Sequence, residues 1–351
     1  MRLLQRLPLL PSLAAAALAA LTLAPSARAQ YPLTPSPLLD ARKLSPTPSL
    51  SGYISVREML RHDTATFMLN QGRLTTAIAP LPYLAIRLQV DFSSGTSGKV
   101  SSDGSVRGFS LADAYVQLAP SPARDSTARV HPALFVGQFK QPFSLEYLTS
   151  FTRLLTADRS LTVDRLSPKR DIGVMGQVRW SRFVTLAGAL VNGDGANATA
   201  NADGRQMALG RLTLTPLPGL ALAAKLGAEG DDHLRGYDAR WIWRELVIEG
   251  EAIHRSRDLA QDTHQDAGGG YVLAAYRVRP WLQPVLKHER FRETLVGTAG
   301  STGTRSDCTT VGLNLAAPGE RLRLQLDWMM RSQRPLPGHD HELGAQLIAI
   351  F

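Results

Sequence analysis

Segments of roughly ten residues, in which apolar and polar side chains alternate, recur through most of this 351-residue chain. In residues 83–92, Leu84, Ile86, Leu88, Val90 and Phe92 fall on one face of a strand, opposite Tyr83, Ala85, Arg87, Gln89 and Asp91. The same alternation appears in 171–180, 237–243 and 320–328. Strands in soluble sandwiches average about five to six residues, whereas tilted strands of about ten residues span the lipid-facing band of an outer-membrane barrel. Strand length therefore predicts an all-β, transmembrane antiparallel β-barrel.

Short turns and longer polar loops alternate between these segments. The short turns are rich in proline and glycine, which suit tight turns, and fall at 79–82, 180–182, 216–219, 243–245, 278–281 and 317–320. The longer loops are expected at 93–106, 192–203, 255–267, 293–305 and 331–340. Bacterial barrels have short periplasmic turns and long external loops, so we predict about 16 strands with both termini on the periplasmic side. Residues 119–132 are expected to form a periplasmic connection, although they are long for one.

The N-terminus has the features of an export signal. Arg2 and Arg6 precede an apolar run, and residues 27–29 form a small-x-small cleavage site, so residues 1–29 are predicted to be a cleaved signal peptide. Residues 30–51, rich in Pro and Ser and without periodicity, are predicted to be a periplasmic leader. The barrel is then expected to occupy residues 52–351, in the cell outer membrane.

Charge and motifs argue against several classes of protein. The formal net charge of +9 falls to +6 without residues 1–29, which contain three arginines and no acid. Such an excess is typical of nucleic-acid binding, but predicted export argues against a nucleic-acid partner. Cys308 is the only cysteine and cannot form an internal disulfide. The histidines lack metal-ligand spacing, and GxSxG and P-loop motifs are absent from the sequence. We therefore predict no enzymatic activity, no cofactor and no metal site.

One connection, residues 140–170, differs from all the others. It lies between the strands predicted at 131–140 and 170–180 and is far longer than an ordinary hairpin loop. Its aromatic and leucine side chains can pack against other elements. It also contains six candidate anion-binding residues: Lys140, Arg153, Arg159, Arg165, Lys169 and Arg170. We predict that this segment folds into the barrel as a constriction loop.

The motifs GQFKQPFSLEYLTS (137–150), DRSL (158–161) and LSPKRDIG (166–173) resemble the phosphate-selective porin family, porins O and P. This resemblance implies a sixteen-stranded trimeric outer-membrane channel, in which the third loop folds into the lumen. It also implies basic residues at the constriction and arginines on the pore wall. Phosphate-specific members use lysine clusters, and this chain has few lysines, so the resemblance favours anion preference over strict phosphate specificity.

The expected pore-wall cations occupy inward positions of the predicted strands: Arg73, Arg87, Arg211, Lys225, Arg240, Arg321 and Arg323. They have two interpretations. They either attract anions, or pair with the inward carboxylates Asp91, Asp113, Glu249, Glu251 and Asp327. In the loop, Arg170 and Asp171 could likewise form a structural ion pair.

The function expected from these features is passive diffusion of anions such as phosphate or polyphosphate. The alternative is a structural or adhesive barrel with a blocked pore. The expected partners are outer-membrane lipid, small anions and two further copies of the chain. The terminal Phe351, on the apolar face of the last strand, resembles the signal read by the barrel-assembly machinery.

Overall fold

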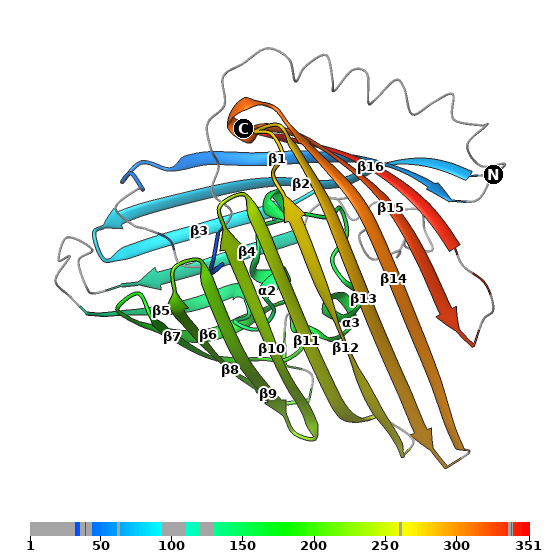
Figure 1. Ribbon diagram of the computed structural model, residues 1–351. Coiled ribbons are helices and arrows are strands. Elements are labelled where there is room, and N and C mark those ends of the chain that lie inside the picture. The colour runs from blue at the N-terminus through cyan, green and yellow to red at the C-terminus, as the bar shows by residue number, and fades with distance from the viewer. Residues whose placement is uncertain are drawn as a thin grey trace, which may run out of the picture.

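The computed structural model describes residues 32–35, 39, 44–61, 64–92, 110–119, 129–198, 200–201, 203–259, 262–298, 300–335, 338 and 340–351. Sixteen strands each pair with their neighbours in sequence, and the ring closes where the first strand pairs with the last (Figure 1). Every pairing is antiparallel. The predicted fold class is confirmed. The predicted signal peptide and the loop expected at 93–106 lie outside the described residues.

The strands are β1 (Ser49–Arg61), β2 (Thr64–Leu81), β3 (Leu84–Asp91), β4 (Ser110–Leu118), β5 (Val130–Lys140), β6 (Arg170–Trp180), β7 (Val184–Val191), β8 (Met207–Leu217), β9 (Leu220–Glu229), β10 (Asp232–Trp243), β11 (Leu246–Leu259), β12 (Thr263–Tyr276), β13 (Leu282–Gly297), β14 (Gly300–Ala316), β15 (Leu322–Arg334) and β16 (Asp340–Ile350). Between β5 and β6 lie α2 (Leu145–Leu148), η2 (Phe151–Arg153) and α3 (Leu161–Leu166). A further short helix, η3 (Pro318–Glu320), joins β14 to β15. No helix among the described residues has the length and apolar character needed to cross a membrane.

The period of two along each strand sorts side chains between the outside and the lumen. In β10, Tyr237 and Trp241 are exposed on the outer face, whereas Asp238 and Arg240 are buried on the inner face. The same sorting applies to large apolar side chains around the ring, including Leu186, Leu226, Val272 and Trp328. An apolar exterior around a polar interior is the arrangement that lipid imposes on a barrel, because closure satisfies the backbone and the outer side chains contact hydrocarbon.

Two of the predicted loops are wrong. Residues 255–267 and 293–305 lie mainly within β11, β12, β13 and β14, which pair as far as Leu259↔Thr263 and Gly297↔Gly300. Their polar composition is typical of loops, but a strand with water on both faces needs no apolar side chains. It needs only a partner for each backbone group. The strands β12 to β14 therefore extend beyond the shorter strands β6 to β9 on one side of the barrel (Figure 1).

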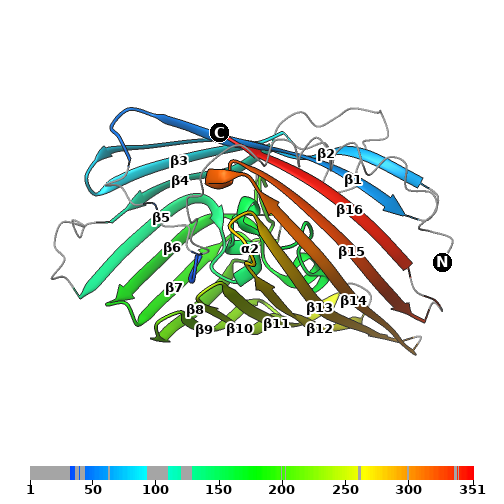
Figure 2. The ribbon, with the colours of Figure 1, turned by 45° about the horizontal axis from the view of Figure 1, so that its top comes forward.

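The connection between β5 and β6 lies inside the ring of strands, where Figure 2 shows α2 surrounded by the barrel wall. It leaves the wall at the paired residues Lys140 and Arg170. The Ser144 hydroxyl accepts a hydrogen bond from the Tyr147 amide and so caps α2, and Ser160 caps α3 in the same way. Buried apolar residues of the loop, including Phe143 and Val163, join lumen-facing residues of the wall in one cluster. The predicted inward-folded third loop is confirmed.

Candidate functional site: the constriction loop and its anion pathway

The wall carboxylate Glu251 holds the start of α2. It accepts hydrogen bonds from the Ser144 hydroxyl (3.0 Å) and from the amides of Leu145 (3.1 Å) and Glu146 (3.1 Å). These amides lie in the first turn of the helix, where no intrahelical acceptor exists, so an anion is favoured there. Lys225 on β9 forms an ion pair with the same carboxylate. Charge on β9 and β11 thus fixes the position of α2.

Glu146 connects the two helices of the loop to each other and to β13, two strands along the wall from β11. Its buried carboxylate accepts hydrogen bonds from Lys287 Nζ on β13 (2.8 Å) and from the Ser160 amide at the start of α3 (2.7 Å). A carboxylate with two strong donors is well satisfied despite its burial. Lys287 was missed from sequence as a partner of this loop, because no motif distinguishes it.

A second set of contacts ties the loop to β1, β14 and β15. Asp158 forms a two-pronged ion pair with Arg57 on β1, with both N–O distances 2.6 Å. The Ala157 amide donates to Asp327 (2.7 Å), and Asn314 donates to the Leu155 carbonyl (2.8 Å). Burial opposes ionisation of Asp158, but the hydrogen bonds and charge of Arg57 outweigh it and lower the pKa of this loop carboxyl.

Three of the six predicted loop cations fasten the loop. Lys140 Nζ donates to the carbonyls of Tyr147 (2.7 Å), Leu148 (3.4 Å) and Thr149 (3.3 Å). Arg170 pairs with Asp113 on β4 (2.7 Å) and donates to the Tyr147 hydroxyl (3.0 Å).

The ion pair considered between Arg170 and Asp171 is not formed. Instead, Asp171 accepts hydrogen bonds from the backbone amides of Ile172, Gly193 and Gly195.

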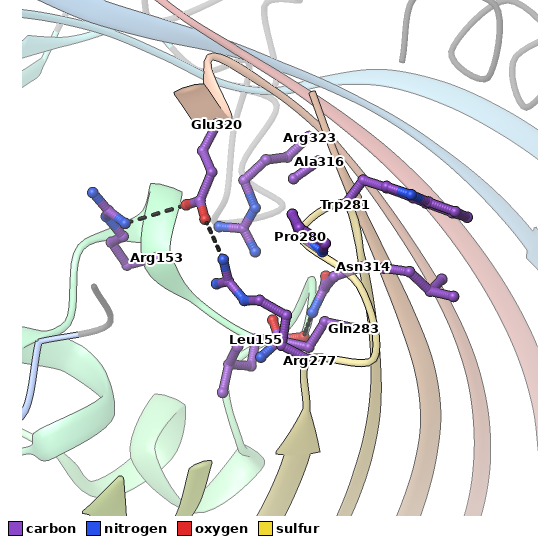
Figure 3. A pocket seen from close by; sticks show the side chains of 11 residues that line it. Arg153, Leu155, Arg277, Pro280, Trp281, Gln283, Asn314, Ala316, Glu320 and Arg323 are labelled. Atoms are coloured by element: carbon purple, nitrogen blue, oxygen red, sulfur yellow. Dashed lines mark hydrogen bonds and ion pairs between the residues drawn. The ribbon is translucent and has the colours of Figure 1, made fainter. Parts of the chain in front are cut away.

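Arg153 is the third cation that holds the loop to the wall, and Figure 3 shows it near the turn between β14 and β15. It pairs with Glu320 (3.2 Å), which also accepts from Arg277 (3.1 Å). The cavity drawn there has a volume of about 20 Å³. That space holds about one water molecule, so it cannot pass an anion.

The other three loop cations remain available to a solute. Lys169 is exposed, and among the described residues it pairs with Asp164 alone, which is also exposed (2.8 Å). Arg165 is exposed on α3 and forms no ion pair with a described residue. Arg159 likewise has no carboxylate partner among the described residues. Its guanidinium lies over the Tyr147 ring, 5.1 Å from the centroid.

Tyr147 organises the cations at this point. Lys140 and Arg170 also lie over its ring, at 5.3 Å and 5.8 Å. Contact with the negative face of an aromatic ring stabilises a cation without neutralising it. Tyr147 stands in the motif at 137–150, but nothing in the sequence indicated that it would gather three cations.

The wall cations are mostly paired. Those that face a carboxylate are Arg73 with Asp91 (2.8 Å), Arg87 with Asp113 (3.0 Å), Arg211 with Asp238 (2.8 Å), Lys225 with Asp238 (2.9 Å) and Arg240 with Glu249 (2.7 Å). Arg323 donates to the loop carbonyls of Thr152 and Leu154. Arg321 lies outside the wall, exposed at the end of η3 and one residue before β15.

The open space of the lumen lies beside the loop. A cavity of about 450 Å³ is lined by Arg73, Arg159, Lys169 and Arg331, together with Asp158, Asp164 and Glu289 among others. A second cavity of about 440 Å³ shares Arg73, Tyr147 and Lys169 with the first. Of the acids in the first cavity, Asp158 is neutralised by Arg57. Arg331 was missed from sequence, although its inward position in β15 could have indicated it.

The family model for phosphate-selective porins O and P matches residues 83–267, which is more than half of the chain. The chain belongs to this family. The match runs from the turn before β3 into β12 and includes the whole constriction loop. Family and fold together make this porin an outer-membrane channel protein. No relative was found among curated protein sequences.

Solved structures of other porins share the fold of this porin at low identity. The anion-selective porin from Comamonas acidovorans has a TM-score of 0.61 and 11% identity, covering 87% of this chain and 99% of that one. OmpF of Salmonella typhi, in complex with daunomycin, has a TM-score of 0.62 and 11% identity, covering 87% and 97%. The trimer form of OmpT, an outer membrane protein of Vibrio cholerae, has a TM-score of 0.60 and 11% identity, covering 87% and 99%.

Proposed function

We propose that this porin is a passive diffusion channel that prefers small anions such as phosphate, and that Arg159 is its main selective contact. The observation that supports this proposal is the uncompensated guanidinium of Arg159 beside a water-accessible cavity. Two charges in contact attract each other by about 1 kcal/mol in water and about 4 kcal/mol at the lower effective dielectric near a protein surface. The planar guanidinium also matches the oxygens of phosphate-like anions.

Cations of the constriction loop, rather than those of the wall, select the anions. The five paired wall cations contribute little net charge to the lumen, because five wall carboxylates face them: Asp91, Asp113, Asp238, Glu249 and Glu251. Salt screens charges farther than about 8–10 Å from the solute. Arg159, with Lys169 and Arg165 nearby on the same loop, is therefore the group that a passing anion meets at short range.

The end of the barrel that bears the termini faces the periplasm, since it has the short turns typical of that side in bacterial barrels. Residues 1–29 direct export and are removed. Three copies assemble in the outer membrane, as the OmpT structure in trimer form suggests by analogy of fold. Phosphate competes with chloride for the site near Arg159, without the strict specificity that a lysine cluster would provide.

The substitution Arg159→Gln tests the proposal. We expect the wild-type channel in a planar bilayer under a KCl gradient to show an anion-selective zero-current potential, and the variant to lose on the order of tenfold in anion-to-cation permeability ratio. Added phosphate should reduce chloride current in the wild type and have less effect in Arg159→Gln.

Arg182→Gln is the matched control, because Arg182 lies in the exposed turn before β7 and its guanidinium lies over the Phe183 ring. It should keep wild-type selectivity. A conducting channel in which Arg159→Gln leaves the zero-current potential unchanged would reject the assigned site. A folded barrel that never conducts would favour the structural or adhesive alternative.

A further inference from the structure

Three arginines stand in one row on the outer face of the barrel. Arg292 on β13 is the register partner of Arg305 on β14, which is also the register partner of Arg334 on β15. The alternation along each strand turns all three side chains away from the lumen. Arg292 and Arg334 are exposed, and the Arg305 side chain is 32% exposed. The row lies near the long hairpin of β13 and β14, at the end of the barrel opposite the chain termini (Figure 1). We name these three residues the arginine row.

The carboxylates of the outer face do not neutralise this row. Arg305 pairs with Asp307 (2.7 Å), but the same carboxylate also pairs with Arg290. Arg292 and Arg334 form no ion pair with a described residue. Four arginines therefore share one carboxylate. Like charges at directly opposed positions of a sheet repel one another, so the row is unfavourable without a further anion.

The neighbouring strand β12 does not supply that anion. The residue opposite Arg292 on β12 is Gly268, which has no side chain. The nearby outward carboxylate of Asp266 pairs with His254 on β11 (3.0 Å). The charge of Arg292 is therefore left to a partner from outside the chain.

The outer face changes from apolar to cationic along the same three strands. Leu286, Val311 and Trp328 form another row of register partners on β13, β14 and β15, and all three are exposed. This apolar row and the arginine row are six residues apart on each strand. At about 3.3 Å per residue and a tilt of about 40°, that spacing is roughly 15 Å along the barrel axis. Since the apolar row contacts hydrocarbon, the arginine row lies beyond the hydrocarbon edge.

We propose that the arginine row binds phosphate groups on the saccharide headgroup of a glycolipid in the outer leaflet. The headgroup layer of an ordinary phospholipid bilayer is roughly 5–8 Å deep on each side, so the phosphate of a simple phospholipid does not reach the row. A phosphate carried on sugars does. Guanidinium groups bind phosphate oxygens in two-pronged, charge-assisted hydrogen bonds, while the acyl chains of the same lipid contact the apolar row.

This lipid site lies outside the lumen. The inference uses the proposed orientation, with both termini in the periplasm, and is independent of the anion selectivity of the pore. A channel without anion preference would leave it intact, and its failure would leave the role of Arg159 intact.

Arg292→Gln combined with Arg334→Gln tests the inference. The purified full-length porin, in a neutral detergent, is titrated with a lipopolysaccharide that has phosphorylated core sugars and no O-antigen. Native mass spectrometry counts the bound lipid. We expect the double variant to bind on the order of tenfold more weakly than the wild type, because two of the three guanidinium contacts are lost. The same lipid, dephosphorylated with hydrofluoric acid, should bind the wild type as weakly.

Arg182→Gln combined with Arg244→Gln is the matched control. Both arginines lie in exposed turns at the periplasmic end, over the rings of Phe183 and Trp243, so the control removes the same charge from the other rim. It should bind the lipid like the wild type. The inference is overturned if the test variant binds as tightly as the wild type, or if the wild type binds the intact and dephosphorylated lipids equally.

The wild type alone provides a second measurement if the test variant does not fold. The intact lipid should raise the temperature at which the folded form is lost in detergent, because a ligand of the folded state stabilises it. The dephosphorylated lipid should raise it less. Equal stabilisation by inorganic phosphate at the same phosphate concentration would assign the row to free anions and reject the lipid. A folded variant that changes oligomeric size but keeps its lipid would assign this face to a contact between copies, and would also reject it.

Discussion

Single charged pairs determine which cations of the lumen are available to a solute. Arg57 forms an ion pair with Asp158, and Arg170 forms one with Asp113. Both arginines face the lumen, but these pairs hold the constriction loop to the wall. Arg159 differs because it lies over the Tyr147 ring and donates to the Glu146 carbonyl (3.5 Å), and it pairs with no carboxylate of a described residue. The charge that we propose to be selective is therefore the loop cation that no carboxylate of a described residue neutralises.

The pair between Arg57 and Asp158 predicts an acid-sensitive anchor. Because the pKa of Asp158 is lowered in the folded protein, the pair contributes fully above the unfolded value of about 3.9 and is lost as the pH falls through the lowered value. Bilayer recordings should show steady currents from neutral pH down to about pH 4 and flickering in stronger acid. Asp158→Asn should flicker already at neutral pH, because Arg57 then lacks its counter-charge.

Asp258→Asn provides the comparison, since Asp258 pairs with His264 on the exposed outer part of β11 and β12. It should record like the wild type at neutral pH. If currents through Asp158→Asn flicker no more than those through Asp258→Asn, the ion pair between Arg57 and Asp158 does not hold the loop.

At this scale the sequence predicts which cations exist and which face of a strand each occupies. Alternation in β2 and β3 is enough to place Arg73 and Asp91 inside. It does not predict that they are register partners, because pairing depends on the bulges and stagger of two strands. The ion pair with Asp91, which neutralises Arg73, is therefore visible only in the folded barrel.

Among the elements, α3 depends on a glycine in the wall. The run Gly268-Gly269-Gly270 lies within β12, and α3 packs against β11, β12 and β13. A Cβ on Gly269 would meet Thr162 Oγ1 of α3 at 2.5 Å and would also press on the Arg290 carbonyl. The missing side chain is what lets the helix approach the wall.

Gly269→Ala should therefore displace α3 and cost on the order of 1–3 kcal/mol. We expect faster tryptic cleavage at the exposed Arg165 and Lys169 in the folded, detergent-solubilised protein, followed by electrophoresis. Gly176→Ala on β6, where a Cβ would meet no atom within 4 Å, should be cut at the wild-type rate. Equal cleavage rates in the two variants would show that α3 tolerates the extra methyl group.

Some strands could be predicted from the sequence over their full length, and others only in part. Strands such as 83–92 were found because each contacts lipid on one face and water on the other, which enforces a period of two. The ends of β11 to β14 were missed because water on both faces removes that period. The inward loop was recognised from its length and composition, but the role of Gly269 depends on α3, a contact between segments far apart in sequence.

At the scale of the whole molecule, closure depends on the meeting of the two chain ends. Gly52 and Phe351 exchange backbone hydrogen bonds of 3.0 Å in each direction, and the β1–β16 register begins next to them. The Phe351 ring lies so close to Gly52 that a Cβ there would meet it at 2.6 Å. The last residue is therefore both part of the seam and an exposed aromatic group at the barrel rim.

Phe351→Ala should reduce the amount of folded barrel in the outer membrane, because the assembly machinery loses its aromatic signal, while refolding in detergent micelles proceeds as in the wild type. The heat-dependent shift in electrophoretic mobility of the folded form measures both the amount of folded barrel in the membrane and the extent of refolding in micelles. Phe351→Tyr keeps an aromatic ring and should restore assembly in cells. Equal membrane yields for Phe351→Ala and the wild type would remove this residue from the assembly signal.

The contacts of Pro32 and Leu39 with the wall were not predictable from the sequence. Residues 30–51 have no periodicity, and a Pro/Ser-rich composition is equally compatible with a free tail. Only the folded barrel places Gln117 and Arg240 where they form hydrogen bonds with Leu39 and Pro32.

The register partners Lys140 and Arg170 have one further consequence. Since the chain leaves and re-enters the sheet at directly opposed residues, everything between them is an insert in what is otherwise a plain hairpin. A different insert could be grafted at this junction without moving any strand, so the scaffold and its filter are free to diverge separately.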